Sequence, residues 1–446
     1  MRNKKEWGIY VYFAADVPST AMRRAARLNL LKLADVGSND EVGITAMLDV
    51  TDQDTQFYVM PEQPENKDEW LVNPAKSEQN VNSASTETIQ SFFEWSVQNS
   101  PARKIALVFY GHGYAIDDFD PRLESQEPLD LQDAENELAE EDGLGRELES
   151  GFDDAPSPAA ISANRFARSR SLPLKLLFDS THDQVLNNDQ VGDVIRACRK
   201  SLPEDSDLAI LGFDCCNMAM AEVLCEMQGC ADIAVAAETG LPFQSWVSQR
   251  MLQEVLLHVP RDPKVLARVA VDNFIQSFAD KSSTYVALSA CNLDLCEQFE
   301  SAAAGLAAAL CDAVSGPANR EAIFRSRNDC VCFDPDGFID LDCFCGFLSQ
   351  DLAGTAVAKE AIQVRKALRE FVIVSKFAPN FPDRRISLST GLSIWFPPWI
   401  QNPAVEIPQK EGSIAYFENG YHRTRFARAT GWDRFLSRLL MEMNKN

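Results

Sequence analysis

The chain has 446 residues, of which 46% are hydrophobic, and its formal net charge at pH 7 is −24. This length and composition predict a globular protein with a large buried core, and they exclude a fibrous or wholly disordered chain. The negative charge argues against nucleic acid as a partner, because a phosphate backbone is bound by Lys and Arg that displace its counterions. Basic substrates or partners suit the chain better.

The N-terminal residues 1–7 lead directly into a run of β character, without the apolar stretch and small-residue cleavage site of a signal peptide. No window reaches the roughly 18 uninterrupted apolar residues of a membrane span. We therefore expect a soluble, cytoplasmic protein without membrane association. In that reducing compartment, the 12 cysteines are expected to be small core residues with one reactive exception, rather than disulfides.

Two C-x-C pairs, Cys330 with Cys332 and Cys343 with Cys345, raise the question of a structural zinc site. Structural zinc usually uses cysteines separated by about two to four residues, with turn residues between them. The second pair here lies in an apolar run instead. We therefore expect core packing and no metal at these cysteines.

Strand and helix patterns alternate along the chain. Continuous apolar runs rich in β-branched and aromatic residues predict buried strands at 7–15, 42–50, 104–110, 207–214, 233–237 and 284–290, with a late strand at 390–396. Apolar residues at spacings of three and four predict helices at 20–34, 85–98, 218–227, 247–258, 263–278, 293–314 and 355–374. Ser85 or Thr86 is expected to cap the second helix.

This alternation predicts an α/β fold with a mostly parallel sheet of six or more strands and helices on both faces. We assign a catalytic domain to residues 1–290 and a helical and β accessory region, packed on the same domain, to residues 291–446. A long connection at 115–175 interrupts the first unit. Its first half is rich in Asp and Glu and its second half is basic, and connections of this length are usually functional or disordered.

Two reactive side chains follow two of the predicted strands. His112 lies between two glycines after the strand 104–110, and Cys216 lies between the strand 207–214 and the helix 218–227. Loops at the carboxyl ends of parallel strands converge on the ligand site, so we expect these two residues to meet there. A neighbouring imidazole and a helix N-terminus both favour the thiolate, which makes the pair a candidate base and nucleophile.

The residues around this pair resemble a known family. Tyr110-Gly-His112-Gly113 and Asp214-Cys-Cys216-Asn-Met218 look like the His-Gly and Asp-x-Cys-x-Met motifs of clostripain-type cysteine peptidases, which are similar to caspases, gingipains and legumain. The resemblance implies a caspase-like fold and covers most of the chain, but not 115–175. It extends to the segments 7–16, 178–186, 221–223, 289–293 and 391–397.

By this resemblance, Cys216 is the nucleophile and His112 the general base, and the backbone N–H groups of Gly113 and Cys216 form the oxyanion hole. Asp214 matches the acidic residue of the primary specificity pocket, which implies an endopeptidase that cleaves after basic residues. Arg is expected to be preferred over Lys, because its planar guanidinium binds a carboxylate through two hydrogen bonds. The substrates would be proteins or peptides with exposed Arg or Lys.

The sequence departs from the family pattern in two places. Cys215 stands where the family commonly has Ala, and strand alternation predicts that its thiol faces the core and is inert. The segment 236–240 follows the family's acidic, Gly-Pro-containing segment only loosely, and Glu238 is the candidate for a second acid in the pocket.

Relatives are often made as precursors that are cleaved between the His and Cys strands, where the 115–175 loop lies. An acidic pocket would accept basic residues of the chain itself, so we expect a zymogen that is activated by cleavage, autocatalytic or by an upstream protease. The candidate cleavage sites are Arg165, Arg168, Arg170 and Lys175.

Other functions remain open. A catalytically inactive caspase-like scaffold or regulatory binding protein is the main alternative, and an acyl transferase on the same sheet is another. No cofactor is expected to be required. Calcium is left open, because some relatives respond to it and the acidic run offers oxygen ligands, although no EF-hand pattern is present.

Overall fold

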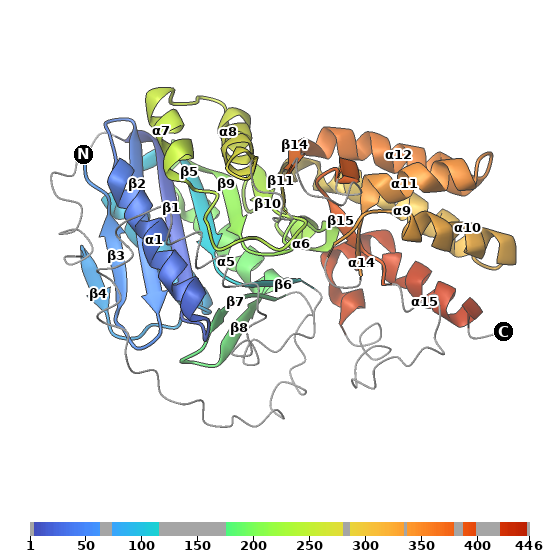
Figure 1. Ribbon diagram of the computed structural model, residues 1–446, viewed down its shortest axis with the longest axis horizontal. Coiled ribbons are helices and arrows are strands. Elements are labelled where there is room, and N and C mark those ends of the chain that lie inside the picture. Colours follow the sequence, from blue (N-terminus) through green and yellow to red (C-terminus); the bar gives the residue numbers. More distant parts are fainter. Residues whose placement is uncertain are drawn as a thin grey trace.

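A nine-stranded sheet forms the centre of the computed structural model, which describes residues 4–62, 74–115, 175–279, 286–333, 337–378, 387–397 and 420–443. The strand order is β14-β11-β10-β9-β5-β1-β2-β3-β4 (Figure 1). Their bounds are β1 Lys5–Ala15, β2 Val42–Val50, β3 Thr55–Val59, β4 Lys76–Glu78, β5 Ala102–Tyr110, β9 Asp207–Asp214, β10 Ile233–Ala236, β11 Ala287–Asn292 and β14 Val372–Phe377. The five strands from β10 to β2 pair in parallel, and the strands outside them pair antiparallel.

The parallel strands are buried on both faces, which explains why they are continuous apolar runs. All nine residues of β2 are buried, whereas edge strand β14 is mostly half-buried. Two helical layers cover the sheet. One face carries α1 Thr20–Val36, α7 Gln249–Leu257 and α8 Pro263–Gln276, and the other carries α3 Thr86–Asn99, α5 Asn188–Ser201 and α6 Ala221–Glu226 (Figure 1). Ser85 caps α3 by accepting the Thr88 N–H at 3.1 Å, so one of the two predicted caps is confirmed.

Two small antiparallel sheets flank the large one. The first joins β6 Gly113–Ala115, β7 Lys175–Asp179 and β8 Gln184–Asn187, directly after β5. The second joins β12 Cys332–Phe333, β13 Phe338–Asp340 and β15 Ser393–Trp395. The late strand of the sequence analysis is therefore real, but it belongs to a small sheet rather than to the central one.

The C-terminal region shares its core with the central sheet. It contains η5 Leu293–Leu295, α9 Cys296–Ala313, α10 Pro317–Asn328, α11 Leu341–Asp351, α12 Ala356–Phe371, η8 Tyr421–Arg423, α14 Arg425–Thr430 and α15 Trp432–Met443. One continuous cluster of buried side chains runs from Phe92 of α3 to Trp432 of α15. In addition, β14 returns from this region to the central sheet, so residues after 290 contribute a strand to it.

Two predictions needed correction. The helix predicted at 355–374 ends at Phe371, and Val372-Ile-Val begins β14. The sequence does not reveal this boundary, because no Gly or Pro separates the helix from the β-branched run. The helix predicted from Met218 begins at Ala221. The residues between Cys216 and this helix form a bend instead, with Asn217 in the left-handed region at φ 57°.

Candidate active site

The predicted base lies where β5 leaves the central sheet. Gly111 donates its N–H to the carbonyl of Asp214 at 3.3 Å, which extends the pairing of β5 with β9 past Tyr110. The carbonyl of His112 accepts the Leu177 N–H at 2.9 Å, so β7 holds this residue from the other side. The backbone of His112 is therefore fixed by two sheets, and its side chain is partly exposed.

The predicted nucleophile lies on the adjacent strand end. In the register of β5 and β9, Tyr110 lies opposite Asp214, so two further residues on each strand bring His112 and Cys216 to the same level. The contact of the two loops is close: a Cβ atom on Gly113 would lie 2.2 Å from the carbonyl oxygen of Cys216. A side chain at position 113 would push these loops apart, so glycine is required there.

The thiol of Cys216 is partly exposed and has a partner that the sequence did not reveal. Its Sγ accepts the backbone N–H of Leu241 at 3.2 Å. A hydrogen bond to the sulfur favours the thiolate over the thiol. The expected helix N-terminus does not directly follow Cys216, because α6 begins five residues later and has only six residues.

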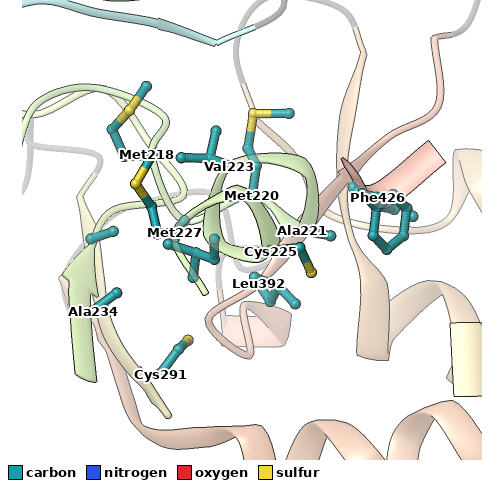
Figure 2. Close-up of a cluster of buried hydrophobic side chains, with 14 of the residues drawn as sticks. Met218, Met220, Ala221, Val223, Cys225, Met227, Ala234, Cys291, Leu392 and Phe426 are labelled. Atoms are coloured by element: carbon teal, nitrogen blue, oxygen red, sulfur yellow. The ribbon is translucent and has the colours of Figure 1, made fainter. Parts of the chain in front are cut away.

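Backbone hydrogen bonds to the segment after β10 hold the loop that carries Cys216. Asn217 donates its N–H to the carbonyl of Thr239 at 3.0 Å, and Ala219 donates to Ala237 at 2.8 Å. Met218 and Met220 are fully buried and lie with Val223, Cys225, Leu392 and Phe426 in one apolar cluster (Figure 2). The C-terminal region thus packs directly beneath the nucleophile loop.

Asp214 is a buried carboxylate on the face covered by α7 and α8. It is 4% exposed, and it accepts hydrogen bonds from the side chain of Ser245 and the backbone of Trp246. Burial raises the pKa of Asp214 to about 7, and those two bonds oppose the shift. Its Oδ2 has no hydrogen-bond partner among the residues that the structure describes.

The segment around Ser245 is itself held against β5 and β9. Tyr110 donates its hydroxyl to the carbonyl of Phe243 at 3.0 Å, and the Asn29 side chain donates to the same oxygen at 2.9 Å. The ring of Trp246 packs where Gly212 has no side chain, since a Cβ there would lie 2.4 Å from the ring. This segment therefore forms a rigid wall beside Asp214.

A comparison with known protein families shows to which family the chain belongs. The model of the clostripain family matches residues 175–438, more than half of the 446 residues. The chain belongs to the clostripain family. Membership makes it a cysteine protease in family and fold, with proteins or peptides as its class of substrate.

Solved clostripain-type structures share the caspase-like fold over nearly the whole chain. A secreted C11 cysteine protease from Bacteroides thetaiotaomicron, solved with an irreversible peptide inhibitor, matches with a TM-score of 0.58 at 12% identity, over 96% of this chain and 99% of that chain. An inactive zymogen C11 protease from Parabacteroides distasonis matches with a TM-score of 0.54 at 15% identity, over 96% and 99%. At such identities the likeness shows the fold alone. None of the curated proteins compared with the chain matches it.

Cys215, the departure from the family motif, faces the core as predicted. It is 1% exposed, and its thiol points to the carbonyl of Phe109 at 3.4 Å. Burial raises the pKa of the Cys215 thiol well above its ordinary value, so this sulfur is not a competing nucleophile.

Glu238 is not brought together with Asp214. Its carboxyl group lies on the opposite face of the sheet, where it accepts hydrogen bonds from Ser389 and from the backbone of Gly391 at 3.0 Å and adjoins Asp340. Burial, followed by the charge of Asp340, raises the pKa of Glu238 well above its ordinary value. These contacts give Glu238 a structural position at the join with the C-terminal region rather than a place in the pocket.

Of the predicted cleavage sites, Arg165, Arg168 and Arg170 lie outside the described residues. Lys175 is described: it is the first residue of β7 and pairs with Asn187 on β8 and Ala115 on β6. A backbone paired on both sides is not free to enter a protease site.

The remaining sequence features have structural positions. Among the C-x-C cysteines, Cys330 and Cys345 are buried in the core, Cys343 lies near Cys330, and Cys332 is exposed. Within the described segments, the grouping of potential metal ligands does not involve any cysteine. No helix in those segments has the length and apolar character needed to cross a membrane.

Proposed function

We propose that this protein is an endopeptidase that cleaves after basic residues, Arg in preference to Lys, with Cys216 as nucleophile and His112 as general base. The observation that carries the proposal is the meeting of the two loops at the ends of β5 and β9, with Asp214 two residues before the nucleophile. Both side chains are partly exposed and thus within reach of a substrate.

The reaction begins when His112 takes the proton of the Cys216 thiol. The sulfur attacks the carbonyl carbon of the scissile bond, and the backbone N–H groups of Gly113 and Cys216 donate to the oxyanion that forms. His112 then gives its proton to the leaving amine as the C–N bond breaks, and an acyl-enzyme remains. Water, activated by His112, hydrolyses the thioester and restores the thiol.

Asp214 supplies the preference for basic residues. It is buried, and no Lys or Arg among the described residues forms an ion pair with it. A substrate guanidinium would provide the missing counter-charge and donate to the Oδ2 oxygen that lacks a partner. A substrate ammonium would do so through a single point of contact, which is why Arg is the better fit.

Activation by cleavage in the 115–175 segment follows from where that segment is attached. Its two ends enter the same small sheet, since Gly113 pairs with Leu176 across β6 and β7. After a cut between these strands, β6 and β7 could still pair, and β5 and β9 would still be neighbours in one sheet. We therefore infer that the cut chain stays assembled and that the cut frees the site.

The test is hydrolysis of fluorogenic peptides that end in Arg, Lys, Asp or Ala, with intact masses recorded in parallel. The wild type should prefer Arg over Lys, and should turn over Asp and Ala peptides at least about 100-fold more slowly, the size expected when a buried charge loses its partner. Cys216→Ala and His112→Ala should lose activity, and Cys215→Ala should retain it. Activity that survives in Cys216→Ala, or an equal rate on all four peptides, contradicts the proposal.

A further inference from the structure

Three aspartates meet at the ends of β1, β2 and β7. Asp16 follows β1, Asp49 is the penultimate residue of β2, and Asp179 is the last residue of β7. A carboxylate oxygen from each lies within 4.8 Å of those of the other two. Their side chains are at most 1% exposed, so three acids share one interior site.

Hydrogen bonds from neighbouring residues orient these carboxylates but do not neutralise them. Thr51 donates to Asp16 at 2.7 Å, and Ser83 donates its N–H to Asp179 at 2.8 Å. Among the residues that the structure describes, no Lys or Arg forms an ion pair with any of the three. The basic side chain that contacts them is His182, whose Nδ1 lies 2.9 Å from Asp179 and which is 31% exposed.

Asp49 provides a second, independent indication of a missing ligand. Its Oδ1 accepts the hydroxyl of Thr55 at 2.7 Å, whereas its Oδ2 is buried and has no hydrogen-bond partner among the described residues. The nearby Ser83 hydroxyl acts to lower the pKa of Asp49, but the hydrogen bond that this hydroxyl forms is a long one to Asp179, at 3.5 Å. A buried carboxylate oxygen without a partner is costly unless something binds it.

We propose that Asp16, Asp49 and Asp179 form a binding site for a divalent cation that prefers oxygen ligands, with calcium as the best fit. Calcium is bound by oxygens at about 2.3–2.6 Å, so ligands on opposite sides of the ion are up to about 5 Å apart, which suits this cluster without rearrangement. Magnesium usually keeps several waters and binds through one or two carboxylates, so a buried site with three carboxylates suits it less.

The position of the site gives the cation a structural task beside the catalytic loop. Asp179 lies two residues after Leu177, which donates its N–H to the carbonyl of His112 and has a left-handed backbone at φ 60°. The side chain of Leu177 packs against Gly111, where a Cβ would lie 2.8 Å from it. A cation that ties β7 to β1 and β2 would therefore hold the segment on which His112 depends.

The test is thermal unfolding and calorimetric titration of the full chain in the Cys216→Ala background, which prevents autolysis. After treatment with a chelator, added Ca²⁺ should raise the Tm by about 2–5 °C and Mg²⁺ by less, as expected for a ligand that binds the folded state alone. Asp49→Asn should abolish the Ca²⁺ shift. It should also leave the Tm without calcium equal to or above that of the parent, because one of three mutually repelling charges is removed.

Asp54→Asn is the matched control, since Asp54 is an exposed acid on the turn between β2 and β3. It should keep the full Ca²⁺ shift. Asp179→Asn provides a second variant if Asp49→Asn does not fold. A Ca²⁺ shift that persists in both cluster variants would overturn the proposal and move the binding to the acidic run 117–154. Absence of any shift or heat in the parent protein would also overturn it. The readouts do not depend on cleavage after basic residues, so the two proposals fail separately.

Discussion

Asp214 and Glu238 are both buried acids with a raised pKa, but their surroundings suit them to different roles. Both carboxyl groups are buried near the carboxyl end of the central sheet, and burial is the largest cause of a raised pKa in each. Each keeps one carboxylate oxygen without a hydrogen-bond partner among the described residues. Their surroundings differ. Glu238 accepts from Ser389 and Gly391 and adjoins the carboxyl group of Asp340, whereas Asp214 accepts from Ser245 and Trp246 and has no described carboxyl group beside it.

The difference identifies which acid is available to a ligand. A proton shared between Glu238 and Asp340 would offset the repulsion of their two charges, and Asp340 also accepts from the backbone and the hydroxyl of Thr390 at 2.6 and 2.9 Å. That pair joins the end of β10 to the segment before β15. Asp214 has no neighbouring carboxyl to share a proton with in this way, so a cationic side chain of a substrate is its natural partner. A raised pKa alone would not have separated the two.

The largest expected effect comes from neutralising each acid in turn. Asp214→Asn should lower kcat/KM for Arg peptides by about 10²–10³-fold, because a buried charge pair is worth roughly 2–5 kcal/mol. Glu238→Gln should change it by less than about threefold. Steady-state kinetics with Arg and Ala peptides measures both. If the two variants lose Arg cleavage equally, the assignment of Glu238 to a structural role is wrong.

The stability of the fold should depend on the hydrogen bonds that Glu238 makes. Glu238→Ala leaves Asp340, Ser389 and the Gly391 N–H without their partner, so we expect a loss of about 2–4 kcal/mol in the free energy of unfolding. Glu238→Gln keeps the size and an acceptor oxygen for Ser389 and Gly391 and should lose less than about 1 kcal/mol. Urea unfolding in the Cys216→Ala background provides the values. An equal loss in both variants would show that volume, rather than hydrogen bonding, matters at this position.

The pH dependence of stability offers a further effect with a defined sign. The pKa of Asp214 is about 7 in the folded chain, against 3.8 for the free side chain, so the folded state holds its proton more tightly. The contribution of Asp214 to the free energy of unfolding is fully present below about pH 4. It falls by up to roughly 4 kcal/mol as the pH rises to about 7. Asp214→Asn should remove this loss. Unfolding at pH 5 and pH 8 would show a smaller pH difference in the variant than in the parent, and an unchanged difference would contradict the assigned pKa.

Much of the fold could be predicted because local signals agreed with tertiary packing. Buried parallel strands are continuous apolar runs, and β1, β2, β5 and β9 all appear where such runs occur. The missed strands are short or at the edge: β4 has three residues, and β14 follows a helix without a break. Edge strands carry weaker apolar patterns, since only part of their surface is buried.

The candidate site could likewise be predicted only in part. His112, Gly113, Asp214 and Cys216 lie within sequence motifs at strand ends, and strand order alone brings them together. The Leu241 N–H that binds the Cys216 sulfur is a backbone group, which no residue type reveals. The face of the sheet on which Glu238 lies depends on the register of β10, and register is not visible in one sequence. The aspartate cluster draws on three distant strand ends and was likewise missed.

The smallest effect should come from the hydroxyl groups that serve each acid. Ser245 lowers the pKa of Asp214 by donating to it, so Ser245→Ala should raise that pKa further and shift the rise of Arg cleavage to higher pH by less than about one unit. Ser389→Ala removes the matching donor from Glu238 and should leave the profile of kcat/KM against pH in place. Because an ionised Asp214 is what binds Arg, the Ser245 variant should recover wild-type activity as pH rises. A uniform loss at every pH would instead mean that Ser245 shapes the pocket without tuning its charge.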